Sequence, residues 1–334
     1  MPIVREPHFK PAWWLNSPHL QTLWPALFRR SPAVPTLRER LVTPDGDFID
    51  LDWCGGDAPA PLVLVLHGLT GSSRSAYMRG MQAALACRGW RSVALNFRGC
   101  SGEPNRTARC YHSGDTADLD FLYRHLRRCA PLAPLAAVGF SLGGNVLLKW
   151  LGEKGGALDL LAAAAVSVPL QLDRCADRLD RGFSKLYRDR LLRELKDYIH
   201  HKRAHLQRLG EAGEREKLDR LGDLSGIRSF WEYDDRVVAR LYGFRDAEDY
   251  YRQSSSRQYL QSIQVPTLIV QAWDDPFTTP EILPAEAELS SHVRLEITAG
   301  GGHVGFVAGS PAGPRYWLEQ RIPEFFRECF PAGD

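Results

Sequence analysis

The stretch that decides the fold is Leu135-Ala-Ala-Val138-Gly139-Phe140-Ser141-Leu142-Gly143-Gly144-Asn145-Val146. An apolar run typical of a buried strand leads into a G-x-S-x-G pentapeptide, and a helical pattern follows from Gly144. A serine exposed on a tight strand-to-helix turn needs small residues two positions away on either side, because larger side chains would collide with the strand and the helix. Ser141 is therefore predicted to be a nucleophile, with the N–H groups of a helix start beside it.

Short apolar runs recur on both sides of this stretch, and the earlier ones alternate with amphipathic segments of helical spacing. This rhythm is typical of βαβ units, so the sequence predicts an α/β fold with a mostly parallel central sheet and helices on both faces. An amphipathic closing helix is expected from about Arg315 to Glu328. Besides Leu135–Val138, the expected strands are residues 62–66, 91–95, 162–166, 265–271 and 293–297.

Residues 171–255 break this rhythm, because they are rich in charged residues with helical spacing and contain no obvious strand. We interpret them as a helical cap inserted into a core made of residues 1–170 and 256–334, with an N-terminal extension over about residues 1–36. Long insertions of this kind tend to be functional, which favours a lid. A solvated helical face with no role in substrate access is the alternative.

A serine nucleophile of this type has an acid and then a histidine after it in the chain. His303 follows three glycines just after the last expected strand, and it is the predicted base. Two adjacent carboxylates, Asp274 and Asp275, follow the preceding strand. Asp275 is the preferred acid because it stands directly before Pro276, and Asp274 is then a turn residue.

Acyl transfer also needs two hydrogen-bond donors for the oxyanion. The backbone N–H groups of Leu142, after the nucleophile, and of Leu69, in the loop after the strand 62–66, are the predicted pair. His67 is interpreted as a structural residue of that loop. Residues 96–99 and 111–114 border the site in one interpretation, but a turn with a packed arginine and a helix entry capped by Ser113 explain them equally well.

Composition excludes several classes of protein. Hydrophobic residues make up 44% and charged residues 25%, as in ordinary globular proteins. Lys plus Arg (42) nearly balances Asp plus Glu (40), so the net charge of +2 argues against a nucleic-acid partner. The seven cysteines include no CxxC pair, which argues against a zinc site or a disulfide framework. Without a signal-like segment or an apolar run of the roughly 20 residues that cross a bilayer, we expect a cytoplasmic protein with no transmembrane helix.

Several longer motifs are more specific than the G-x-S-x-G turn alone. They are Phe9-Lys-Pro-Ala-Trp-Trp-Leu-Asn-Ser-Pro-His-Leu-Gln-Thr22, Asn96-Phe-Arg-Gly-Cys-Ser-Gly-Glu103, Tyr111-His-Ser-Gly114, Gly139-Phe-Ser-Leu-Gly-Gly-Asn145, Tyr242-Gly-Phe244, Asp249-Tyr-Tyr251, Asp274-Asp-Pro276 and Gly302-His303. Together they resemble the motifs of one family, the YheT-like branch of α/β hydrolases, also called the AB hydrolase 4 family. The resemblance spans nearly the whole chain and implies the α/β-hydrolase fold. Members are hydrolases or esterases, and eukaryotic relatives act on lipid esters or transfer acyl groups to alcohols, so it also implies ester chemistry.

The sequence thus predicts a serine carboxylesterase that needs no metal or organic cofactor and cleaves a small-molecule acyl ester, a lipid-like one included. Acyl transfer by the same residues is the alternative, and a non-catalytic binding module is the hypothesis from another class. Neither the natural substrate nor the oligomeric state can be read from the sequence. Some aromatic side chains are candidates for an acyl pocket or for peripheral membrane contact, although simple packing explains them as well: Trp13, Trp14, Trp24, Trp231 and Tyr242.

Overall fold

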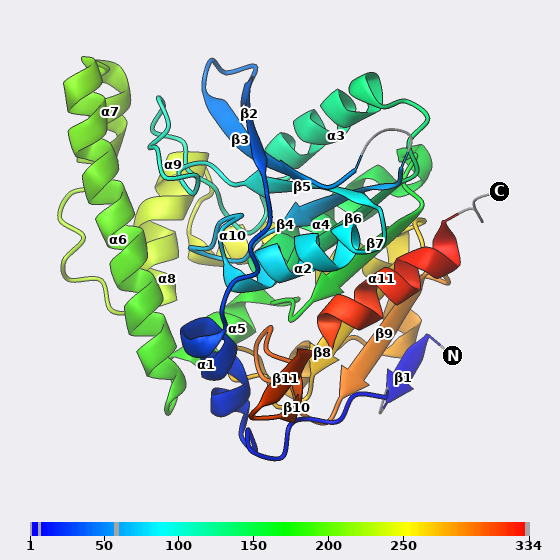
Figure 1. Ribbon diagram of the computed structural model, residues 1–334. Coiled ribbons are helices and arrows are strands. Elements are labelled where there is room, and N and C mark those ends of the chain that lie inside the picture. Colours follow the sequence, from blue (N-terminus) through cyan, green and yellow to red (C-terminus); the bar gives the residue numbers. More distant parts are fainter. Residues whose placement is uncertain (1, 6–7, 57–59, 331–334) are drawn as a thin grey trace.

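The computed structural model describes residues 2–5, 8–56 and 60–330, and a nine-stranded sheet runs through its centre (Figure 1). The strand order is β1-β9-β8-β7-β6-β4-β5-β3-β2, and every neighbouring pair is parallel except β5–β3 and β3–β2. The predicted mostly parallel α/β sheet is confirmed. Its strands are β1 (Ile3–Arg5), β2 (Leu37–Val42), β3 (Phe48–Cys54), β4 (Leu62–Leu66), β5 (Arg91–Asn96), β6 (Leu135–Phe140), β7 (Ala162–Val166), β8 (Thr267–Ala272) and β9 (Val293–Thr298).

Helices cover both faces of the sheet, so its central strands are apolar on both sides. In β4, Leu62, Leu64 and Leu66 pack into one core cluster with α3 and α4, whereas Val63 and Val65 pack into the other with α2 and α11. This alternation follows from the period of two along a strand. The covering helices are α2 (Ala76–Ala86), α3 (Ala117–Cys129), α4 (Leu142–Lys154) and α11 (Leu318–Cys329).

Both edges of the sheet contain strands that the sequence pattern did not reveal. Within the expected N-terminal extension, β1 lies parallel to β9 at one edge. At the other edge β2 and β3 form an antiparallel pair in which Asp50 and Asp52 of β3 accept hydrogen bonds from Arg40 and Arg38 of β2. The sequence pattern did not predict β3, because its alternating carboxylates are not typical of a buried strand. In the fold these carboxylates are buried and accept hydrogen bonds from arginines.

The closing helix begins later than predicted, at Leu318 rather than near Arg315. Arg315 belongs instead to β11 (Gly313–Tyr316), which forms an antiparallel hairpin with β10 (Val307–Ser310). The cross-strand hydrogen bonds of that hairpin, whose two strands are joined by a short turn, override the helical spacing of these residues.

The described chain between residues 172 and 254 contains helices and loops and no strand. Its apolar side chains form a cluster of their own, distinct from the two that flank the sheet. In the described residues, no helix has the length and apolar character needed to cross a membrane. The helices of this segment are α5 (Leu172–Leu179), α6 (Ser184–Leu209), α7 (Ala212–Asp219), α8 (Phe230–Tyr233), the π-helix η2 (Asp234–Ala239), α9 (Arg240–Tyr242) and α10 (Ala247–Ser254), and α1 (Pro18–Phe28) precedes the sheet core.

Candidate active site

Ser141 occupies a sharp turn between β6 and α4, with φ 51° and ψ −119°. Its N–H donates to the carbonyl of Val166 at 2.8 Å, which anchors this strained conformation. A Cβ added at Gly139 would overlap the Gly143 carbonyl, and one at Gly143 would lie 2.5 Å from the His67 carbonyl oxygen. The two glycines therefore allow β6, α4 and the His67 loop to approach closely. Helix α4 begins at Leu142, two residues before the helical pattern indicated.

Three side chains from distant parts of the chain meet at this turn. The Nε2 atom of His303 lies 2.9 Å from Ser141 Oγ, and its Nδ1 atom lies 2.8 Å from Asp275 Oδ2. Asp275 is buried and also accepts the backbone N–H of Phe277 at 2.8 Å. The Phe277 ring stacks on the imidazole with 4.0 Å between centroids. Because a carboxylate can only accept, Nδ1 carries the proton and Nε2 offers its lone pair to the serine hydroxyl.

Asp274 points to a different partner. Its Oδ1 accepts the Gly302 N–H at 3.0 Å, so it braces the loop just before His303, and burial raises its pKa above the usual range. Of these two carboxylates, Asp275 is thus the one that contacts the imidazole in the described structure.

The N-terminal motif of the family resemblance holds the His303 loop from the other side. Thr22 Oγ1 accepts the N–H of His303 at 2.9 Å. Gln21, only 1% exposed, accepts the Val307 N–H at 2.8 Å and donates to the Val307 carbonyl at 3.1 Å. Neither Gln21 nor Thr22 was predicted from the sequence to belong to a site. The signal that could have indicated them is the presence of two adjacent polar residues in an otherwise largely apolar helix, α1.

Backbone strain is concentrated around the same place. Every described non-glycine residue with positive φ lies in a loop at the carboxyl ends of the central strands or in the His303 loop, and such conformations cost about 1–3 kcal/mol each. The surrounding contacts must therefore hold these loops in place, as Ser167 does by accepting the Val304 N–H at 2.9 Å. These residues are Thr70, Ser141, Ser167, Val304 and Phe306.

The loop after β4 presents the predicted oxyanion donor, Leu69. The Phe97 N–H donates to His67 Nε2 at 3.1 Å, so Nδ1 carries the ring proton and donates to the Gly68 carbonyl at 2.7 Å. Burial lowers the pKa of His67 to about 4, which keeps the ring neutral. Because C=O and N–H of a trans peptide point in opposite directions, this bond turns the Leu69 N–H away from His67. Among the described residues, neither this N–H nor that of Leu142 has an acceptor.

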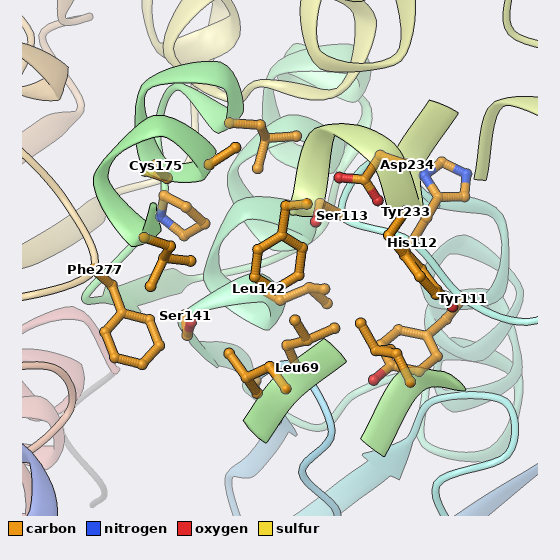
Figure 2. Close-up of a pocket in the computed structure, with 18 of the residues that line it drawn as sticks. Leu69, Tyr111, His112, Ser113, Ser141, Leu142, Cys175, Tyr233, Asp234 and Phe277 are labelled. Carbon is orange, nitrogen blue, oxygen red and sulfur yellow. The ribbon is translucent and has the colours of Figure 1, made fainter. Parts of the chain in front are cut away.

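A cavity of about 430 Å³ opens beside Ser141 and His303, and its walls are largely apolar (Figure 2). Helix α1 lines one part of it, the helices between residues 172 and 254 supply about half of the lining residues, and loops and helix starts of the sheet core supply most of the others. Three residues of a motif that the sequence left ambiguous, Tyr111, His112 and Ser113, also line it. Ser113 does not cap α3, whose N-cap residue is Thr116. Lining residues from the helical segment include Leu172, Cys175, Ala176, Leu179, Leu191, Leu195, Phe230, Tyr233, Asp234, Val238 and Tyr242.

Apart from Trp13, the other polar and aromatic residues considered from the sequence have contacts within the protein. Arg98 is buried and paired with Asp118, as a packed arginine of a turn would be. Tyr242 lines the cavity, whereas the Trp231 indole donates to Asp177. Among the remaining aromatic residues, Trp14 and Trp24 pack edge to face. Trp13 is 77% exposed.

Comparison with known proteins identifies the family. Residues 61–310 match the family described as alpha/beta hydrolase fold. YheT of Escherichia coli (strain K12), which its name describes as a candidate esterase, is 43% identical over 95% of this chain and 92% of its own. The chain belongs to the YheT-like α/β hydrolases.

Other proteins resemble this α/β hydrolase more distantly. The phospholipase ABHD3 of Mus musculus is 33% identical over 92% of this chain and 75% of its own length. The solved structure of the Pyrococcus furiosus esterase Pf2001 superposes with a TM-score of 0.57 at 18% identity, covering 90% of this chain and 94% of that one. At that identity the likeness concerns the fold alone.

No group of three or more His, Cys, Asp or Glu side chains is arranged as metal ligands would be in residues 2–5, 8–56 and 60–330. The predicted absence of a cofactor stays a prediction.

Proposed function

We propose that this protein cleaves carboxylic esters, with Ser141 as nucleophile, His303 as base and Asp275 as the residue that orients the imidazole. The observation that carries the proposal is the continuous chain of contacts from Asp275 through His303 to Ser141, opening on an apolar cavity. The names of two relatives, a candidate esterase and a phospholipase, support an ester as the substrate class.

The geometry suits a two-step acyl transfer. Ser141 Oγ attacks the carbonyl carbon while its proton passes to His303 Nε2, and Asp275 stabilises the imidazolium that forms. The developing oxyanion accepts hydrogen bonds from the N–H groups of Leu69 and Leu142. The carbon–oxygen bond to the leaving alcohol then breaks and the alcohol takes the proton from Nε2. Water, deprotonated by the same nitrogen, attacks the acyl-serine and releases the acid.

The helical segment between residues 171 and 255 acts in this proposal as a cap that shapes the substrate pocket. Its buried apolar side chains line the cavity above the serine, and an acyl chain placed there leaves water. Apolar side chains also remain exposed on α1 and at the start of α6: Leu20, Leu27, Phe28, Phe183 and Leu186. His19 and Phe183 bring these two helices together at 4.4 Å between ring centroids, which supports peripheral contact of this face with lipid.

Hydrolysis of p-nitrophenyl esters from acetate to palmitate tests the proposal, with Ser141→Ala as the matched variant. We expect serine-dependent turnover, a chain-length optimum set by the cavity, and labelling by a fluorophosphonate in the wild type alone. Equal turnover by Ser141→Ala would refute the triad. Absence of labelling at Ser141 in the folded wild type would support a non-catalytic binding role instead.

Acyl transfer to an alcohol is an outcome of the same chemistry, in which an alcohol replaces water at the acyl-serine. Product analysis with a competing alcohol distinguishes the two reactions. We expect free acid as the main product, and an excess of the transfer ester over the ratio set by solvent competition would reassign the protein as an acyltransferase.

A further inference from the structure

The cavity wall holds a carboxyl group that the proposed mechanism does not use. Asp234, the first residue of η2, lies on the side of the cavity opposite Ser141 (Figure 2). Its carboxyl group lines the cavity, and the residue is only 9% exposed. The hydroxyl of Tyr251 donates to its Oδ2 at 2.6 Å. Its Oδ1 has no donor among the described residues, and none of their basic side chains forms an ion pair with it.

The groups around Asp234 leave it without a counter-charge. His112, which faces the same part of the cavity, is kept neutral because burial lowers its pKa to about 3. Two basic side chains close to other residues of the cavity wall are engaged elsewhere, since Arg109, near His112, pairs with Asp115, and Lys202, near Cys110, donates to the Arg109 carbonyl. Burial accordingly raises the pKa of Asp234 to about 7.

Several aromatic side chains line the cavity around the Asp234 carboxyl group. Tyr233, Tyr250 and Tyr251 are all buried and line the cavity. The hydroxyls of Tyr250 and Tyr251 have protein partners, but that of Tyr233 has none in the described residues. A carboxyl oxygen and a phenol oxygen thus have no partner among the described residues, in a cavity whose walls are largely apolar. Burying such groups without partners is costly, so this part of the cavity is suited to a polar ligand group.

We propose that Asp234 recognises a hydrogen-bond donor, a hydroxyl or a protonated amine, which the substrate carries at a distance from the scissile carbonyl. The proposal rests on the ester hydrolysis proposed above and narrows its substrate class. Oδ1 accepts the hydrogen bond while Tyr251 holds Oδ2. Because Asp234 lies across an apolar space from Ser141, the substrate has an apolar segment between its ester and its polar end. A π-helix at this place fits such a role, since π-helical turns often occur at functional sites.

Matched ester pairs test this proposal. In one series the acyl chain ends in a hydroxymethyl or an ethyl group, at four to ten carbons, with one chromogenic leaving group. In a second series butyrate esters carry ω-hydroxy, ω-dimethylamino or isosteric hydrocarbon ends on the alcohol. The two series show which side of the ester faces Asp234, and the hydroxyl and amine members separate the two donors.

We expect one chain length in one series at which the polar member exceeds its hydrocarbon partner in kcat/KM about tenfold or more. Asp234→Leu should abolish or reverse this ratio while hydrolysis of the hydrocarbon esters continues. Asp234→Asn keeps an acceptor oxygen but no charge, so it should lose an amine preference and retain part of a hydroxyl preference. Asp235→Asn is the matched control, because Asp235 is the exposed neighbour in the same helix and should leave every ratio unchanged.

Two failures are distinguishable. If hydrocarbon esters are turned over but the polar members show no preference, or a preference that Asp234→Leu does not alter, the recognition role is wrong and the esterase stands. If no ester in either series is hydrolysed and Ser141 is not labelled by a fluorophosphonate, the proposed function fails and the recognition role fails with it. Serine labelling of Asp234→Leu at the wild-type rate shows that the variant folds.

Discussion

The N-terminal segment of residues 9–28 and the helical segment of residues 172–254 both border the same cavity, but with different chemistry. The N-terminal segment holds the His303 loop through hydrogen bonds, in which Thr22 accepts the His303 N–H and Gln21 accepts the Val307 N–H. The helical segment presents mainly apolar side chains to the cavity. Directional bonds fix the position of a reacting group, whereas apolar packing defines a volume.

This difference implies a division of labour. Changes in the contacts of the His303 loop should slow the reaction of every ester alike, because they disturb the base. Changes in the helical wall should alter which ester is preferred and leave the shortest esters nearly unaffected. Asp234 is an exception, because it is an acidic residue in a helical segment that presents mainly apolar side chains to the cavity.

The largest expected effect concerns the two adjacent carboxylates beside His303. Asp275→Asn should lower kcat by about 10³- to 10⁴-fold, because an amide at this position no longer stabilises the protonated imidazole or its correct tautomer. Asp274→Asn, which weakens only the bond to the Gly302 N–H, should cost less than about tenfold. Steady-state kinetics with one p-nitrophenyl ester checks both, and the reverse ranking would transfer the acid role to Asp274.

The pH dependence of the stability of Asp234→Asn tests whether the Asp234 carboxyl group lacks a counter-charge. The pKa of about 7 in the folded state lies above the 3.8 of an aspartic acid in the unfolded chain, so the native state binds the proton more tightly and wild-type stability falls as pH rises from about 4 to about 7. The amide of Asp234→Asn does not titrate, so the variant does not lose this stability as pH rises. Its free energy of unfolding relative to wild type should therefore rise by about 2–3 kcal/mol between pH 5 and pH 8. Urea unfolding at both pH values measures it, and a flat difference would show that Asp234 has a counter-charge in solution.

Thr22 tests the polar side of the comparison. Thr22→Val keeps the shape but removes the acceptor of the His303 N–H, so kcat should fall about tenfold for all chain lengths with little change in KM. Thr22→Ser retains the hydroxyl and should stay close to wild type. A loss confined to long-chain esters would mean that Thr22 shapes the pocket and does not position the base.

Ala176 tests the apolar side, with the smallest expected effect. This residue of α5 is buried and lines the cavity, so Ala176→Leu should narrow it. We expect kcat/KM to fall about fivefold for long-chain esters, and less than about twofold for acetate. Arg174→Leu places the same side chain on the exposed side of the same helix and is the control. An equal loss for acetate would contradict the division of labour.

Local patterns along the chain were sufficient for the fold class and the central strands, because a buried parallel strand must be apolar on both faces and a G-x-S-x-G turn must follow such a strand. They also indicated Ser141, Asp275 and His303 as candidates, since chain order and the strand ends restrict where partners of a serine nucleophile can lie. The structure brings these three side chains into contact. Their catalytic roles remain the proposal to be tested.

Tertiary structure alone decided the features that depend on contacts between distant segments. The strand β3 was not predicted, because no local pattern reveals that its carboxylates pair with arginines of β2. Likewise, Thr22 meets His303 and Asp234 faces the cavity only after the chain has folded. A sequence displays residue types and their periodicity, but the partner of a buried polar group is set by packing in three dimensions.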